Sequence, residues 1–584
     1  MLPFFERCAS LCYALFSATV FLTAATPHET LVALLEQNWQ HQLRSSPEMA
    51  TAIGDNRYND LLSDRSPGTI ARELDYNKKL LAALQAINPT TLSAGDRLNR
   101  SLAERGLKTD IAGARFKNWE MPATQMGGPQ SYASLAKDTP FNTVHDYENY
   151  LSRLRKLPAV LAQSTGNMRL GMRDGLMPPG YLMAKVAEEA SDVAMKPLAE
   201  NLFTEPVRNF PAALGAPDRV RLTKEINDTV RAKVLPAFAA FAKFVKDEYQ
   251  PKGRKEFGIW SLPDGEARYR QAIEEQTTTT SNPADLHELG LKQVAEIEKQ
   301  MLAIATKQGY PDLKSFNARL FTDKSLHGKS GEQIFGLYQG YTNQMYAKLP
   351  QYFGRLPKNK LVVVPMEAYR APHEVPADYS IGAGDGSRPG RINVNEYEPA
   401  KRLLLNVEAI AYHEGIPGHH LQFSIAQELT DLPPFRKFAE YSAFSEGWAL
   451  YSETLAHEMG FYQDPYSEYG RLQNLMWRSI RLVVDTGVHA QHWSRQQMID
   501  FFHQHSAMDD QNIETEVDRY IAWPAQALSY KLGEMTILRL RERARQQLGG
   551  KFDIRAFHDA VLSGGPLPLD VLEAGVDQWI ASVK

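Results

Sequence analysis

The residues best suited to chemistry lie in one stretch, residues 412–422 (YHEGIPGHHLQ), which holds three histidines and a glutamate. Imidazole nitrogens are good ligands for zinc, and a carboxylate beside the metal can take a proton from an attacking water. The stretch therefore predicts a Zn2+ site in which His413 is a ligand and Glu414 is the general base rather than a ligand.

The spacing of the histidines leaves the second ligand open. At ~100° per residue, His420 would lie within ~20° of His413 on a regular helix, and His419 would lie ~240° away. Pro417, however, cannot donate a hydrogen bond to the carbonyl of His413, and its ring clashes there, which predicts a kink or bulge. A bulge that absorbs two residues would bring His419 round in place of His420.

The third ligand is expected from the segment that follows, residues 442–457. Glu446, Glu453 and His457 recur at intervals of seven and four, which places them on one helical face. Glu446 is the predicted metal ligand. Glu453 or His457 would orient a ligand by hydrogen bonding or replace one. A structural network of paired side chains is the alternative, but these helices are otherwise apolar, and buried ionisable groups need a partner or a metal.

Further candidate residues lie downstream. Arg481, Asp485 and His489 are each four apart on an apolar helix, so we expect an Arg481–Asp485 ion pair, with His489 in the wall of the site. Arg519 could hold a substrate carboxylate, and Tyr530 could donate to the oxyanion of a tetrahedral intermediate. Simple packing or surface roles stay open for both.

Taken together, these motifs resemble a large bacterial family of unknown function that carries the number 885. The resemblance covers mainly residues 360–534 and rests on the segments 385–390, 413–422, 445–449, 484–489 and 524–533. It implies a secreted or lipoprotein-like, mostly helical zinc-peptidase fold. That fold is distantly similar to the angiotensin-converting enzyme, thimet oligopeptidase and carboxypeptidase Taq families.

The motif of those families is His-Glu-x-Gly-His, with a glutamate ligand on a later helix. Matching their Gly-His pair to Gly418 and His419 makes His419 the second ligand and leaves an insertion in the spacing. Dipeptidyl peptidase of the third type tolerates an extra residue between its histidines.

The same resemblance implies substrate contacts. It makes residues 391–395 an edge strand that pairs with an extended peptide, and it matches Tyr530 to a tyrosine that stabilises the transition state. We expect His489 to stabilise the oxyanion together with Tyr530. The residues expected to contact substrate are Arg388, Asn393, Asn395, Arg481 and Arg519.

The elements that must position these residues are mostly helices. Apolar residues recur at helical spacing over 29–85, 145–165, 183–204, 217–249 and 284–307, and again from 398 almost to the C-terminus. Pro399 suits the first turn of a helix that runs into His413. Residues 361–365 and 391–395 read as short strands. The predicted fold class is mainly α, a large helical zincin-like metallopeptidase fold with a small β-sheet beside the active-site cleft.

Composition narrows the class of protein. The 584 residues are 43% hydrophobic and 23% charged, which excludes collagen-like and disordered chains, and the net charge of -4 gives no indication of nucleic-acid binding. Both cysteines, Cys8 and Cys12, lie in an apolar segment that follows Arg7 and ends near Ala25. Together with the residues before it, this segment predicts a signal peptide over residues 1–25, with an uncleaved anchor as the alternative. A lipoprotein signal is less favoured, because Leu11 precedes Cys12.

We therefore predict that residues 26–584 form a single helical unit, in one or two lobes, with its active site in 360–534. The predicted function is zinc-dependent hydrolysis of peptides in the cell envelope, in the periplasm or outside the cell. The alternatives are a metal-dependent hydrolase of non-peptide amides or esters, and a catalytically inactive envelope binding protein. The expected cofactor is Zn2+ and the expected partner a peptide substrate, with membrane contact only through an uncleaved N-terminal segment. The sequence leaves cleavage mode, residue preference and oligomeric state open.

Overall fold

The structure is a computed structural model that describes residues 25–366, 371, 375–384, 386 and 388–584. Almost all of the predicted signal or anchor segment, with Cys8 and Cys12, lies outside these residues. Within the part that is described, no helix combines the length and the apolar character needed to cross a membrane.

The described chain is mainly α-helical with one small sheet, as the sequence predicted. The helices of the N-terminal half are α1 (Pro27–Ser45), α2 (Pro47–Ala52), α3 (Pro67–Ala86), α4 (Ala94–Gly113), α5 (Val144–Asp174), α6 (Gly180–Met195), α7 (Ala216–Thr229), α8 (Leu235–Phe244) and α9 (Gly265–Thr277). Those that follow, up to the sheet, are α10 (Pro283–Lys307), α11 (Leu313–Thr322) and α12 (Gly331–Tyr352). Those after the sheet are α13 (Val407–Glu414), α14 (His419–Glu428), α15 (Pro434–Lys437), α16 (Ser442–Glu458), α17 (Pro465–Ala490), α18 (Arg495–His505), α19 (Asp510–Ala522), α20 (Ser529–Leu548), α21 (Ile554–Leu562) and α22 (Leu569–Val583).

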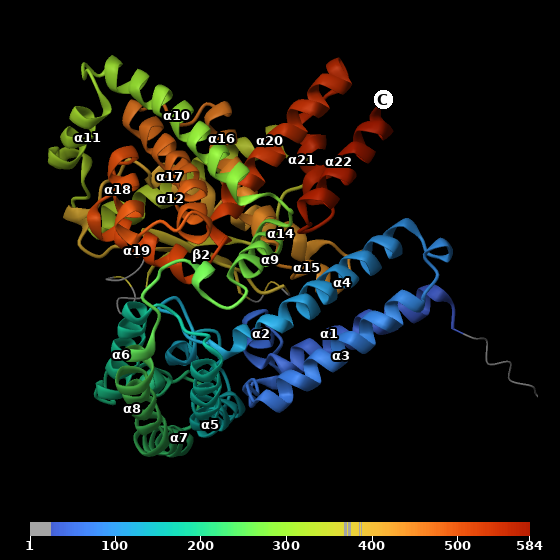
Figure 1. Cartoon of the computed structure of the whole chain (residues 1–584), viewed down its shortest axis with the longest axis vertical. Helices are drawn as coiled ribbons and strands as arrows, with labels where there is room; N and C mark the ends of the chain where they lie inside the picture. The colour runs from blue at the N-terminus through green and yellow to red at the C-terminus, as the bar shows by residue number, and fades with distance from the viewer. Residues whose placement is uncertain (1–24, 367–370, 372–374, 385, 387) are drawn as a thin grey trace, which may run out of the picture.

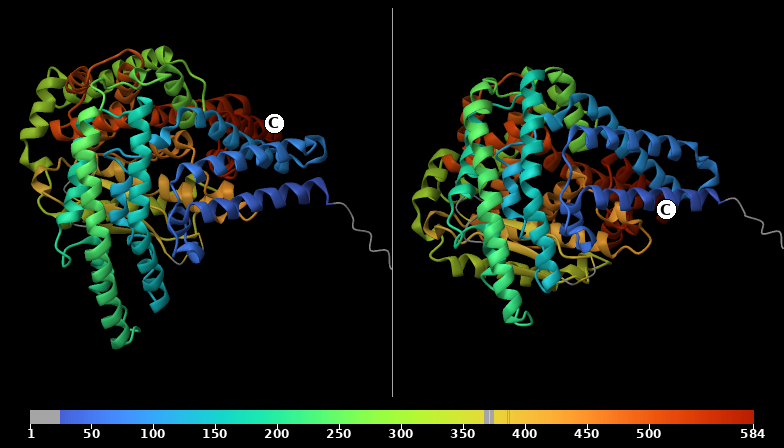
Figure 2. Two further views of the ribbon diagram at one scale, coloured as in Figure 1. Left: turned by 60° about the horizontal axis from the view of Figure 1, so that its bottom comes forward. Right: turned by 90° about the horizontal axis from the view of Figure 1, so that it is seen from below.

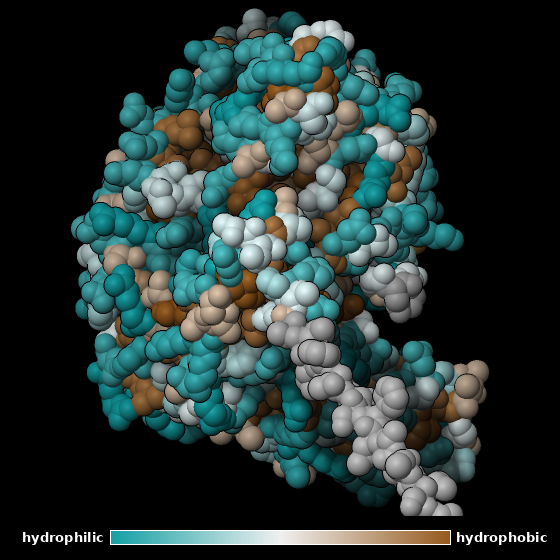
Figure 3. Space-filling view, turned by 90° about the vertical axis from the view of Figure 1, so that its right-hand side faces the viewer, coloured by the Kyte–Doolittle hydropathy of each residue, from teal (hydrophilic) through white to brown (hydrophobic). Residues whose placement is uncertain are grey.

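Helices α1 to α8 lie together on one side of the molecule, and α10 to α12 and α16 to α22 lie on the other (Figures 1 and 2). Helix α17 runs through the second group, where it packs extensively along α10. Residues 478–489 of α17 are all buried. Its charged residues must therefore find partners inside the protein. On the face shown in Figure 3, hydrophobic residues are scattered among hydrophilic ones.

The sheet has three strands, β1 (Leu361–Pro365), β2 (Ala377–Ser380) and β3 (Gly390–Val394), in the order β1-β3-β2. Strand β3 pairs in parallel with β1 and antiparallel with β2. The prediction of an edge strand at 391–395 is therefore wrong, because β3 is the central strand. Both sides of its backbone already carry ladder hydrogen bonds, so it cannot take up a peptide as a further strand.

Several predicted elements differ in extent. The bounds of α10 and β1 agree with the sequence pattern, whereas the pattern over 29–85 divides into α1, α2 and α3. The predicted helix from Pro399 into His413 is wrong, because residues 399–401 form one 3-10 turn and α13 begins at Val407.

Candidate metal centre

A break in the helix sets the position of the two histidines. Helix α13 ends at Glu414 and α14 begins at His419, so the interruption predicted around Pro417 is present. The chain returns so closely that the Gly418 N–H donates to the Tyr412 carbonyl. A Cβ on Gly418 would lie 2.0 Å from the His413 carbonyl oxygen. Only glycine permits this close approach of two backbone segments.

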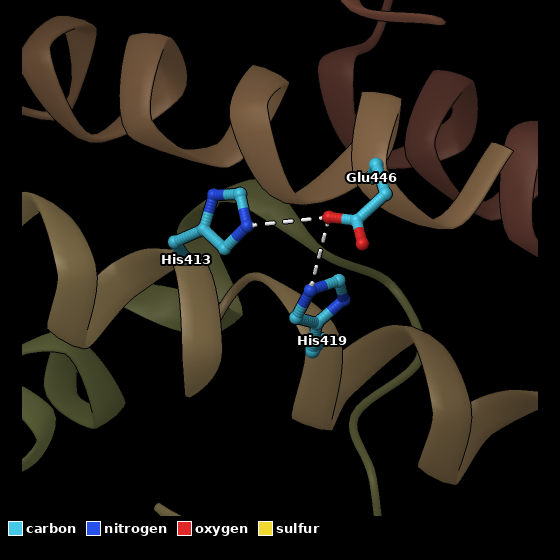
Figure 4. Close-up of side chains that lie close together, drawn as sticks. All are labelled: His413, His419 and Glu446. Carbon is cyan, nitrogen blue, oxygen red and sulfur yellow. Dashed lines mark ion pairs between the residues drawn. The ribbon is translucent and has the colours of Figure 1, made fainter. Parts of the chain in front are cut away.

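The break brings His413 and His419 to the same carboxylate. Nε2 of each imidazole lies 3.5 Å from Oε2 of Glu446 on α16 (Figure 4). The three ligand atoms all lie within 4.8 Å of one another. Tetrahedral zinc with bonds of about 2.0–2.1 Å separates its ligand atoms by about 3.3–3.4 Å. The two nitrogen–oxygen separations of 3.5 Å are close to that value.

Two polar atoms of this cluster have no hydrogen-bond partner within the described chain. They are Oε2 of Glu446 and Nδ1 of His419, and both are buried. Burial raises the pKa of Glu446, but the two imidazoles outweigh it and hold that pKa well below its usual value. Burial lowers the pKa of His413, yet the neighbouring carboxylates of Glu446 and Glu453 raise it overall. The cluster thus favours positive charge at its centre, as a cation site does.

Glu453 holds the first histidine in place. Its Oε1 accepts from Nδ1 of His413 at 2.8 Å, and its Oε2 accepts from Nδ2 of Asn474 at 3.3 Å. Glu453 and Asn474 are both 1% exposed. With Nδ1 protonated, Nε2 of His413 keeps its lone pair for a metal, which is the usual carboxylate–histidine arrangement.

Helix α16, which carries Glu446, packs closely on α20, which carries Tyr530. A Cβ on Gly447 would lie 2.4 Å from Cα of Gly533, so the two helices touch where neither carries a side chain. On α16, the Trp448 Nε1–H donates to the Pro417 carbonyl at 2.8 Å. These contacts tie Glu446 to the helix break that carries the histidines.

Glu414 lies beside the cluster but takes no part in it. Its side chain is partly exposed, and no hydrogen bond reaches its carboxylate from the described residues. Burial raises its pKa, and the charges of His413 and His419 act in the opposite direction. A carboxylate with a raised pKa and no partner can accept a proton.

Tyr530 forms another wall of the site. Its ring stacks on that of His413, with centroids 6.5 Å apart and planes 17° apart. Nη2 of Arg519 donates to the Tyr530 hydroxyl oxygen at 3.1 Å. The hydroxyl proton is thus left to donate elsewhere.

Two predicted alternative ligands lie away from the cluster. His420 is fully buried, its Nε2 lies 3.1 Å from the Asn359 carbonyl, and its Nδ1 lies 3.1 Å from the Tyr379 hydroxyl. Both nitrogens are used there. His457 has a half-exposed side chain that pairs with Glu468 at 3.1 Å, so it neither orients nor replaces a ligand.

The expectations for α17 need correction. His489 accepts from the Ile259 N–H at Nδ1 and donates through Nε2 to the Tyr520 carbonyl, which leaves no donor for an oxyanion. Burial lowers its pKa to about 3. Arg481 pairs with Glu516 at 2.9 Å instead of with Asp485.

The remaining predicted substrate contacts have structural partners. Arg388 donates to the Ala52 carbonyl on α2, Asn393 donates to Asp378 and Ser380, and Asn395 donates to backbone carbonyls near β2. These contacts hold the sheet and its flanks. Arg519, by contrast, donates to the Tyr530 hydroxyl beside the candidate site.

Sequence reasoning overlooked Asn474, Arg478 and Glu516. Arg478 had a visible signal, because it lies three residues before Arg481 and so close to it on a helix surface that is otherwise apolar. Asn474 and Glu516 gave no comparable signal, since their importance depends on which helices pack together.

Comparison with known proteins gives the family. The model of the family described as "Bacterial protein of unknown function (DUF885)" matches residues 47–576. The chain belongs to this family. The expected membership is confirmed, while the zincin-like character of the fold stays a prediction.

Solved structures share the fold. A protein from Colwellia psychrerythraea, described as a "putative lipoprotein", is 26% identical with a TM-score of 0.91, and the match covers 96% of this chain and all of that one. A "putative lipoprotein of unknown function" from Shewanella oneidensis is 18% identical with a TM-score of 0.71, covering 94% and 99%. No curated protein matches the chain.

Proposed function

We propose that this protein is a zinc-dependent hydrolase of peptide bonds. The observation that carries the proposal is the convergence of His413, His419 and Glu446, with Oε2 of Glu446 3.5 Å from both imidazoles and without a hydrogen-bond partner among the described residues. Two imidazoles and one carboxylate are a common donor set of catalytic zinc sites, which keep a further position open.

Each residue has a role in this proposal. Zinc held by these three side chains would polarise the scissile carbonyl and make a water more acidic. Glu414 takes a proton from the attacking water and delivers it to the leaving amine, so the water oxygen ends in the new carboxylate. Glu453 fixes the ring of His413, and the Tyr530 hydroxyl donates to the oxygen on which negative charge develops.

A cleft of about 1120 Å³ supports a peptide-sized substrate. It is lined by α6 residues such as Lys185 on one side, and by Asn474, Trp477 and Arg519 of α17 and α19 on the other. In the cleft wall, Asn474 is hydrogen-bonded to Glu453 and Arg519 to Tyr530. The cleft wall is thus joined directly to two residues of the proposed active site.

Metal analysis and peptide digestion test this proposal. We expect stoichiometric zinc in the purified protein and chelator-sensitive cleavage of a mixed peptide pool. Glu414→Gln should keep the zinc and lose hydrolysis. Cleavage of ester or non-peptide amide substrates alone would change the substrate class. Absence of both zinc and hydrolysis would leave an envelope binding protein.

His419→Gln and His420→Gln form a matched pair for the choice of ligand. The first should abolish zinc binding, and the second should retain it in the folded fraction. The opposite result would overturn the ligand set.

We also propose that the protein is exported to the cell envelope. The apolar segment behind Arg7 and the description of the two structural neighbours as lipoproteins support this. Cell fractionation of the full-length chain, compared with one lacking residues 1–25, tests it. Equal recovery of both forms from the cytoplasm would contradict export.

A further inference from the structure

Three arginines surround the tyrosine that stacks on the first zinc ligand. The guanidinium carbons of Arg478, Arg481 and Arg519 lie 5.9, 4.3 and 6.0 Å from the ring centroid of Tyr530. Arg478 is 6% exposed and Arg481 is 1% exposed. One aromatic ring therefore separates a buried cationic cluster from His413.

The negative charge around this cluster is too small to balance it. Glu516 pairs with Arg481 at 2.9 Å and with Arg519 at 3.5 Å. Arg478 makes no ion pair or hydrogen bond to the described residues. The charge of Glu453 acts on Arg478, but both oxygens of Glu453 are bonded to other side chains. The three cations thus have one dedicated carboxylate among the described residues, and it pairs with only two of them.

Four guanidinium nitrogens of the cluster are buried and have no hydrogen-bond partner in the described chain. They are Nε and Nη1 of Arg478, Nη1 of Arg481 and Nε of Arg519. Leaving charged donors buried and unpaired costs folding free energy, so these nitrogens need further partners, which an anionic ligand would supply. Guanidinium groups bind carboxylates through paired, parallel hydrogen bonds.

We propose that Arg478, Arg481 and Arg519 bind the C-terminal carboxylate of a peptide, so that the protein trims peptides from their carboxyl end. This inference rests on the proposed hydrolase function. The Tyr530 ring centroid lies 6.5 Å from that of His413 and 4.3–6.0 Å from the three guanidinium carbons. An extended chain advances about 3.3–3.6 Å per residue. Only about one to three residues fit between the scissile bond and the carboxylate. Arg519 also lines the cleft, which gives the peptide a route to the cluster.

The first test compares one pool of peptides with free C-termini and the same pool as C-terminal amides. Digestion by the zinc-loaded protein, read by mass spectrometry, should release one to three C-terminal residues from the acids and leave the amides at least about tenfold less cleaved, the worth of one charge-assisted contact. Equal cleavage of both pools, or cleavage at internal bonds, would overturn the proposal.

The second test measures binding, so it is independent of hydrolysis. Peptides retained on immobilised Glu414→Gln protein, with and without chelator, should be enriched in free acids over amides in both conditions. Equal retention, or none, would refute the carboxylate site even if the protein proves to be a hydrolase. Amides retained through internal Asp or Glu would assign the cluster to side-chain carboxylates and overturn the C-terminal mode.

Arg478→Met gives the sharpest variant, because no carboxylate loses its partner. We expect it to reduce the preference for acids over amides about ten- to hundredfold while zinc content stays stoichiometric. Arg478→Lys should restore part of that preference. Arg471→Met is the matched control: Arg471 is a buried arginine on the same helix that pairs with Glu468 instead. An unchanged preference in Arg478→Met would contradict the proposal.

Discussion

Replacing Glu453 with glutamine tests whether the residue behind the first histidine supports the metal site. The carboxylate accepts from Nδ1 of His413 at 2.8 Å in a place where both side chains are almost fully buried. Glutamine keeps the shape but removes the charge. If its oxygen faces His413, its amide nitrogen faces the Asn474 amide nitrogen that now donates to Glu453. Two donors would then oppose each other.

The size of the effect follows from these contacts. Loss of a partner that orients a metal-bound histidine weakens metal binding about 10- to 100-fold, which corresponds to about 1.4–2.8 kcal/mol at 1.4 kcal/mol per tenfold change. An unpaired buried donor also costs about 1–3 kcal/mol of folding stability. We expect weaker zinc binding in a protein that still folds.

Competition with a chromogenic chelator measures the zinc dissociation constant of wild type and Glu453→Gln, and urea unfolding measures their stability. His457→Gln is the control, because His457 lies one turn further along the same helix and pairs at the surface. Its zinc affinity should equal that of wild type. Wild-type zinc affinity in Glu453→Gln, or an equal loss in the control, would refute the reasoning.

Three further predictions follow from the geometry. Gly418→Ala should lose zinc, because its Cβ would lie 2.0 Å from a backbone oxygen, whereas Gly336→Ala meets nothing within 4 Å and should keep it; equal metal contents would contradict this. Burial lowers the pKa of His489 and of His558 to about 3. Each therefore contributes stability that is present above the unfolded pKa of about 6.5 and is lost as the pH falls towards 3. The loss is about 1.4 kcal/mol per histidine and pH unit. Urea unfolding midpoints that stay constant from pH 7 to 5 would refute this predicted loss of stability. Tyr530→Phe should lower kcat about 10²- to 10³-fold with KM nearly unchanged, and an unaltered kcat would remove its oxyanion role.

Local patterns predicted the bounds of some elements well. Helix α10 and strand β1 were predictable because helical spacing and a β-branched run are properties of neighbouring residues. Strand β2 was not, since its sequence Ala-Asp-Tyr-Ser has little strand character and depends on pairing with β3. Without β2, residues 391–395 resembled an edge strand.

Local reasoning from the residues alone left His419 and His420 open, because ideal helical angles favour one and a break at Pro417 favours the other. The backbone return at Gly418 is a tertiary feature, fixed by contacts with the turn before it and with Trp448. Buried ion pairs were equally hard to predict. Arg481 has a carboxylate four residues away in sequence but pairs with Glu516 on another helix, because Asp485 accepts from Tyr269 and from the Ala525 N–H.

The most direct test of the metal site is anomalous X-ray scattering at the zinc absorption edge, from crystals of the protein equilibrated with Zn2+. The proposal predicts one strong peak about 2.0–2.2 Å from Nε2 of His413, Nε2 of His419 and an oxygen of Glu446. No peak between these three side chains, or a peak bound to His420, would contradict it.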